Sequence, residues 1–164
     1  MKYIGIRVTS NDIYYSIIEG KESNYDVISI SNIKIPKALE VPERLSYVRN
    51  LLITIIDQYS IKYAAIRVIE GSAMGKVNGS ILFRVNLEGV IQEVFAGSSI
   101  KEYILARNLN ISSILNTGSR VIKDIATDLK LKDKFKTDSE KVLNEESRES
   151  LVVAIAMFKK KEAC

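Results

Sequence analysis

The 164-residue chain contains no histidine and a single cysteine, Cys164. These two scarcities exclude a Ser-His-Asp triad, a Cys-His dyad, a zinc site built from histidine or cysteine, and a disulfide within the chain. Any acid–base or metal chemistry would therefore depend on carboxylates.

Long apolar runs are also missing. None reaches the roughly 20 residues that a membrane span requires, so we expect no membrane partner. The first residues, Met1 to Ile6, hold neither a long apolar stretch nor a small-residue cleavage site. We therefore expect no signal peptide and a cytoplasmic location.

The composition is that of a globular protein, with 46% hydrophobic and 27% charged residues. Its length suits one domain over residues 1–164. The 24 basic and 20 acidic residues leave a net charge of +4. That excess is compatible with a polyanionic partner. A dedicated DNA-binding domain usually carries a denser positive charge on one face.

The first half of the chain alternates strand and helix patterns. Residues 3–8, 13–18 and 27–35 are rich in β-branched and aromatic side chains, and polar turns separate them, which predicts an antiparallel three-stranded meander. Apolar residues at three- and four-residue steps predict a helix over 42–59. The apolar run 63–69 then predicts a fourth strand, parallel to the first.

The second half is predicted to be mainly helical. We expect helices over about 80–93, 98–108, 117–131 and 145–161, with a short fifth strand at 94–96. The lysines between 130 and 136 are expected in a surface loop. The glycine-rich stretch 71–79 differs from a phosphate-binding P-loop, because only three residues separate Gly71 from Gly75 and a valine follows Lys76.

Three short segments carry a pattern that is shared with one group of nucleases. They are Ile4-Gly5-Ile6-Arg7, Ala65-Ile66-Arg67 and Glu146-Ser147-Arg148-Glu149. With this order of elements, and with a similar helix over 76–93, the chain resembles the RuvC-type Holliday-junction nucleases. The resemblance implies an α/β, ribonuclease H-like fold: a five-stranded mixed sheet of order 3-2-1-4-5 with helices on both faces.

The departures from that family concern its catalytic centre. The family has an Asp on the first strand, a Glu on the fourth and two acids on a late helix, which together bind two Mg²⁺ ions. This chain has Arg7 and Arg67 at the strand positions. Arginine only donates hydrogen bonds and stays protonated, so it can neither ligate Mg²⁺ nor act as a base. We therefore predict no metal site and no catalytic residue at the remnant positions Arg7, Arg67, Glu146 and Glu149.

The two arginines need partners if they are buried. We expect them to occupy the place of the metal ions and to pair with Glu149, and with Glu146 one helical turn away. The alternative is that both point outward into ordinary surface pairs. Glu70 follows Arg67 by three positions, on the opposite face of an ideal strand, and is not expected to contribute.

These inferences favour a RuvC-like protein that has lost metal-dependent nuclease activity, needs no cofactor, and binds nucleic acid or a protein partner. One alternative is an active Mg²⁺-dependent endonuclease with carboxylates drawn from Asp12, Glu70 and Glu149. Another is a protein-interaction or oligomerisation module without nucleic-acid binding. RuvC-type nucleases are dimers, so the resemblance is compatible with a homodimer. The candidate nucleic-acid contacts are Arg7, Arg67, Lys76 and Arg84, with Lys130, Lys132 and Lys134 as a basic rim.

Overall fold

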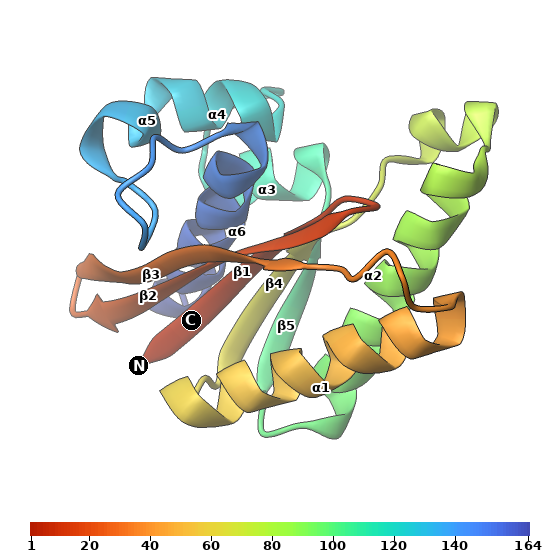
Figure 1. The fold of residues 1–164 in the computed structure, drawn as a ribbon. Helices are drawn as coiled ribbons and strands as arrows, with labels where there is room; N and C mark the ends of the chain where they lie inside the picture. Colours follow the sequence, from red (N-terminus) through yellow and green to blue (C-terminus); the bar gives the residue numbers. More distant parts are fainter.

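The computed structural model describes the backbone of residues 1–164 and every side chain except those of residues 73, 74 and 76. Five strands form one sheet in the order β3-β2-β1-β4-β5, which confirms the predicted order (Figure 1). Their bounds are β1 Lys2–Val8, β2 Asp12–Lys21, β3 Asn24–Lys34, β4 Tyr63–Arg67 and β5 Glu102–Ala106.

The predicted meander is confirmed. β1 pairs antiparallel with β2, and β2 with β3, whereas β4 is parallel to both β1 and β5. The turn between β1 and β2 is held by Thr9, whose side-chain oxygen accepts hydrogen bonds from the amides of Asn11 and Asp12. Such side-chain-to-backbone bonds are the reason that Ser, Thr, Asn and Asp favour turns.

Helices cover both faces of the sheet. In Figure 1, α1 and α2 lie on one face, and α6, with α3, α4 and α5, lies on the other. In the part of the chain that is described, no helix is long and apolar enough to cross a membrane. The bounds are α1 Val41–Tyr59, η1 Gly71–Lys76 (a 3₁₀ helix), α2 Gly79–Gly97, α3 Asn108–Ile114, α4 Ile122–Asp128, α5 Leu131–Lys134 and α6 Glu145–Glu162.

Alternation along β1 divides the core into two halves. Ile4 and Ile6 are buried with residues of α1 and α2, and Tyr3 is buried with residues of α6. Gly5 lies on the α6 side, where a Cβ atom would come within 2.0 Å of the Ser150 carbonyl oxygen. Only glycine allows the backbone of α6 to approach β1 this closely.

The predictions for residues 94–131 need correction. Residues 94–96 are not a strand but the last turn of α2, and the fifth strand is 102–106 instead of part of a helix. Leu87, Ile91, Val94 and Phe95 recur at helical spacing and are all buried on one side of α2. The predicted helix over 117–131 is the shorter α4, and the predicted lysine loop contains the short helix α5.

Candidate functional site

The two arginines at the strand positions point in the same direction. Arg7 of β1 and Arg67 of β4 are direct neighbours in the parallel register. Both follow the alternation that places Tyr3 and Tyr63 on the α6 side of the sheet. The two side chains therefore face α6, and the alternative of outward-pointing surface pairs is wrong.

Arg7 pairs with the first turns of α6. Its Nε donates to Glu149 Oε2 at 2.5 Å, and its Nη1 donates to the Val8 carbonyl. Glu149 is 9% exposed and Arg7 is 17% exposed at the side chain. Asn144 caps α6 by accepting from the Ser147 amide, which fixes where the helix begins and hence where Glu149 projects. The predicted Arg7–Glu149 pair is confirmed.

Arg67 is held more deeply than Arg7. Its Nη1 donates to Glu70 Oε1 at 2.8 Å and to the Val68 carbonyl at 2.6 Å. Its Nε lies 4.0 Å from Glu149 Oε2. That Nε is buried and has no hydrogen-bond partner among the described residues. Glu149 therefore lies between the two guanidinium groups but forms its short contact with Arg7 alone.

Glu70 pairs with Arg67, although the sequence predicted that it would not contribute to the site. β4 ends at Arg67, so the strand alternation that would turn Glu70 to the opposite face no longer applies. The chain bends back, and Glu70 Oε1 accepts from both Arg67 and the Asn108 amide. Sequence analysis missed this contact because it depends on where the strand stops.

A third arginine belongs to the same cluster. Arg84 Nε donates to Glu88 Oε1 at 2.8 Å, one turn along α2, and Glu88 also accepts from the Ile69 amide. Burial lowers the pKa of Arg84, and the positive charges of Arg7 and Arg67 lower it further. We call the six residues the arginine cluster: Arg7, Arg67 and Arg84 with Glu149, Glu70 and Glu88. Its three guanidinium groups and three carboxylates sum to a formal charge of zero.

The residues of this cluster do not fit a divalent cation. A two-metal centre requires several carboxylates with free oxygens. Here each of the three carboxylates accepts a hydrogen bond from a guanidinium. No group of three or more Asp, Glu, His or Cys residues within the described part of the chain could hold a metal ion.

The other predicted carboxylates lie apart from one another. Glu146 forms no ion pair within the described side chains, so its expected pairing with the two arginines is wrong. Burial is the main cause that raises the pKa of Tyr14, and the charges of Asp12 and Glu146 add to it. Asp12 accepts a hydrogen bond from Asn32 at 2.7 Å. The set of Asp12, Glu70 and Glu149, on which an active centre with rearranged acids would depend, is divided among three different partners.

The predicted basic contacts fall into separate places. Arg7, Arg67 and Arg84 belong to one cluster, as described above. Lys130, Lys132 and Lys134 belong to α5 and its start, which Figure 1 places at the far side of the molecule from the beginning of α2. They therefore do not rim the arginine cluster. The side chain of Lys76 lies outside the described residues.

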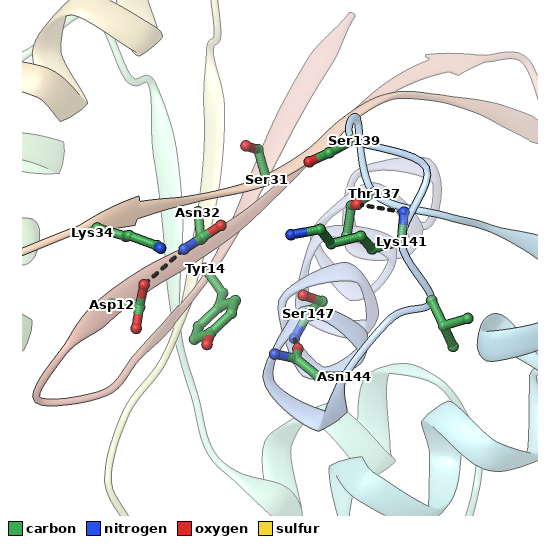
Figure 2. A pocket seen from close by; sticks show the side chains of 11 residues that line it. Asp12, Tyr14, Ser31, Asn32, Lys34, Thr137, Ser139, Lys141, Asn144 and Ser147 are labelled. Carbon is green, nitrogen blue, oxygen red and sulfur yellow. Dashed lines mark hydrogen bonds between the residues drawn. The ribbon is translucent and has the colours of Figure 1, made fainter.

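One hollow is lined by Arg7, and a second is lined by Tyr14, the neighbour of Arg7 on β2. A shallow one of about 220 Å³, the Arg84 hollow, is lined by Arg7, Val8, Thr9, Ser10, Asn78, Ser80, Ile81 and Arg84. The other, of about 280 Å³, is the Tyr14 pocket between β2, β3 and residues 137–147 (Figure 2). Tyr14 is the antiparallel neighbour of Arg7 on β2. Sequence analysis missed the Tyr14 pocket, although the side-chain alternation of the β1–β2 hairpin could have placed Tyr14 beside Arg7.

Comparison with known proteins shows the fold. No family model matches the chain, and no curated protein matches its sequence. Among solved structures, the chain is similar to T. thermophilus RuvC in complex with a Holliday-junction substrate. That match has 10% identity and a TM-score of 0.73, and it covers 98% of this chain and 96% of the other.

Two further resolvases are similar to the chain. The yeast mitochondrial Holliday junction resolvase matches at 10% identity and a TM-score of 0.62, over 96% of this chain and 78% of that one. The Fowlpox virus resolvase in complex with its Holliday-junction DNA matches at 11% identity and a TM-score of 0.54. That match covers 98% of this chain and 99% of the other. The chain therefore has the ribonuclease H-like fold of the RuvC-type Holliday-junction resolvases.

Proposed function

We propose that this protein binds nucleic acid through the region around the arginine cluster and does not cleave it by metal-dependent hydrolysis. One observation carries the proposal. Arg7 and Arg67 are neighbours on the two central strands and face the carboxylate of Glu149. At these two strand positions the resemblance implies metal-binding carboxylates.

The exchange removes the chemistry of a two-metal nuclease. Such an enzyme uses one ion to activate water and the other to stabilise the leaving oxygen. A guanidinium stabilises negative charge but cannot generate a hydroxide nucleophile, because it does not accept a proton. Arg7 and Arg67 therefore place cationic groups, balanced by Glu149 and Glu70, where the resemblance implies metal ions, and these groups cannot carry out the metal-dependent reaction.

Several features support nucleic acid as the ligand. The T. thermophilus and Fowlpox virus proteins of the same fold are solved with Holliday-junction DNA. The Arg84 hollow combines two guanidinium groups with hydroxyl and amide side chains, the groups that most often contact phosphate. Lys34 and Lys141 add positive charge in the Tyr14 pocket.

A binding and cleavage panel tests the proposal. Branched DNA, single-stranded DNA, duplex DNA and RNA-containing substrates are each incubated with the protein, with Mg²⁺ and with Mn²⁺. We expect binding that weakens steeply as salt rises, because phosphate contacts release counterions, and no divalent-dependent cleavage. Calorimetry with either metal should show no tight two-ion binding.

The same panel distinguishes the alternatives. Divalent-dependent cleavage that is abolished by Glu149→Gln would contradict the proposal and show an active nuclease. Lack of binding to every substrate at low salt, where electrostatic attraction is strongest, would favour a protein-interaction module instead.

A further inference from the structure

A row of side chains crosses the α6-facing side of the sheet. Asn32 of β3, Tyr14 of β2, Arg7 of β1 and Arg67 of β4 occupy neighbouring register positions. The arginine cluster takes up the β1 and β4 end of this row, and the Tyr14 pocket takes up the β2 and β3 end. A strand of nucleic acid that crosses above Arg7 would meet the Tyr14 pocket next.

The walls of the Tyr14 pocket are polar around one aromatic ring. Tyr14 itself is half-buried, and burial raises its pKa. Figure 2 shows the ring projecting from β2 toward the start of α6, where Asn144 lies. Besides Tyr14 and the apolar Val142, the lining residues are Asp12, Ser31, Asn32, Lys34, Thr137, Ser139, Lys141, Asn144 and Ser147.

Two lysines supply the positive charge of the pocket. Lys34 comes from β3 and Lys141 from the segment before α6, and Figure 2 shows both ammonium groups pointing inward from opposite walls. Neither forms an ion pair within 4.0 Å with any side chain that the structure describes. The one carboxylate of the pocket, Asp12, accepts from Asn32 instead.

We propose that the Tyr14 pocket takes one unpaired nucleotide of the bound nucleic acid. Its base lies against the ring of Tyr14, and its phosphate lies between Lys34 and Lys141. This inference rests on the proposed nucleic-acid-binding function and names the feature of the substrate that the site would recognise.

Size and chemistry select this ligand. At about 280 Å³ the pocket is slightly smaller than typical drug-sized sites of roughly 300–1,000 Å³, a size that suits one nucleoside better than a base pair. An aromatic ring offers a stacking surface to a base that has left its helix. The amides of Asn32 and Asn144 can donate to and accept from the edge of that base.

The first experiment compares Tyr14→Leu with Tyr47→Leu, a control at an exposed tyrosine on α1. Fluorescence anisotropy measures binding of a single-stranded oligonucleotide and of the duplex with the same sequence. Loss of one stacked base should weaken single-strand binding by Tyr14→Leu about tenfold, and leave duplex binding nearly unchanged. Tyr14→Phe keeps the ring and should bind the single strand within about twofold of wild type.

Lysine variants test the phosphate contact. The double variant Lys34→Gln/Lys141→Gln should reduce the slope of log K against log salt for the single strand by about 1 to 2. Lys101→Gln, an exposed lysine before β5, should leave the slope unchanged. A titration with a free mononucleotide tests whether the pocket binds a nucleotide of a strand or a free nucleotide. The mononucleotide should bind far more weakly than the oligonucleotide. Equal affinity would contradict a strand-bound nucleotide.

The outcomes separate this inference from the proposed function. Unchanged single-strand binding by Tyr14→Leu, or equal losses for single strand and duplex, would overturn the pocket assignment while nucleic-acid binding stands. Absence of wild-type binding to any nucleic acid at low salt would overturn both. Circular dichroism and denaturant unfolding of each variant identify losses that arise from misfolding, and in that case the Tyr14→Phe and lysine results decide.

Discussion

Helix α6 carries an ion-pair network near each of its ends. The two networks differ in burial and in the basic residue, which is arginine in one and lysine in the other. Toward its beginning, Glu149 meets Arg7, with side chains 9% and 17% exposed. At its other end, Lys160 and Lys161 meet Glu102 of β5, with side chains 25–39% exposed. The first network lies at the carboxyl ends of β1 and β4, and the second at the opposite end of the sheet.

The difference shows how burial selects the basic residue. A guanidinium is weakly hydrated and binds carboxylates through a planar set of donors, so it suits a buried pair. An ammonium group is strongly hydrated and retains water at a half-exposed site. Removing one partner from the buried network leaves a charge without compensation, whereas removing one from the exposed network leaves a charge that water can solvate.

The largest expected effect is that of Glu149→Gln. It leaves Arg7 buried without its counter-charge, and should lower the free energy of unfolding by about 3–5 kcal/mol in denaturant titrations. Glu93→Gln, which removes the exposed partner of Arg49, should lower it by less than about 1 kcal/mol. Equal losses in the two variants would show that burial does not distinguish the Arg7–Glu149 pair from the exposed Arg49–Glu93 pair.

Gly5→Ala tests the close approach that positions Glu149. The added methyl group would lie 2.0 Å from the Ser150 carbonyl oxygen and 2.5 Å from the Ala154 amide nitrogen. Because both are backbone atoms, α6 must move away from β1, and we expect a loss of about 3 kcal/mol in unfolding free energy. The control is Gly89→Ala in α2, where nothing lies near the new Cβ atom, so stability should not fall. A small loss for Gly5→Ala would contradict tight packing of α6 at Glu149.

Reversing the charges at the two strand positions should create a metal site there. In Arg7→Asp/Arg67→Glu, two new carboxylates join Glu149, and Mn²⁺ should raise the free energy of unfolding by about 2.7 kcal/mol at a hundredfold excess over its Kd. Calorimetry should show binding to this variant and none to the wild type. The control, Arg49→Asp/Arg120→Glu, makes the same charge change at two exposed arginines and should not respond to Mn²⁺.

The smallest expected effect concerns pH and the exposed network. Hydrogen bonds from Lys160 and Lys161 lower the pKa of Glu102. A lowered pKa in the folded state stabilises the protein above the ordinary Glu value of about 4.3, and this contribution is lost as the pH falls through the folded-state pKa. Glu102→Gln should therefore flatten acid unfolding in that window by less than about 1 kcal/mol. An unchanged pH profile would show that the two lysines do not stabilise the carboxylate.

Local patterns were sufficient for the first half of the fold. The turn residues between β1 and β2, the helical spacing of α1 and the apolar run of β4 each predicted the observed element. Patterns failed at residues 94–96, where an apolar, β-branched and aromatic triplet is compatible with either structure. The helical spacing of Leu87, Ile91, Val94 and Phe95 already favoured the helix, and their burial in one core shows that this pattern outweighs the strand preference of the triplet.

The candidate site likewise has one part that local patterns predicted and one part that they did not. Arg7, Arg67 and Glu149 could be paired from the sequence because strand alternation and helical spacing are local and periodic. The pairing of Glu70 could not be predicted, because the direction of its side chain depends on the residue at which β4 ends. The Tyr14 pocket combines two strands with a segment more than a hundred residues away in the sequence.

The sequence by itself determined which chemical groups are available: it has no histidine, one cysteine, and arginines at positions 7 and 67, where a guanidinium can neither ligate a metal ion nor accept a proton. The tertiary structure alone decided which carboxylate neutralises which arginine and which side chains surround Tyr14. The physical reason is that residue type sets which groups can donate, accept or ligate, while the surroundings of each group tune its proton affinity. The partners and the burial of each group depend on contacts between segments distant in the chain, which become defined only when α6 packs on β1.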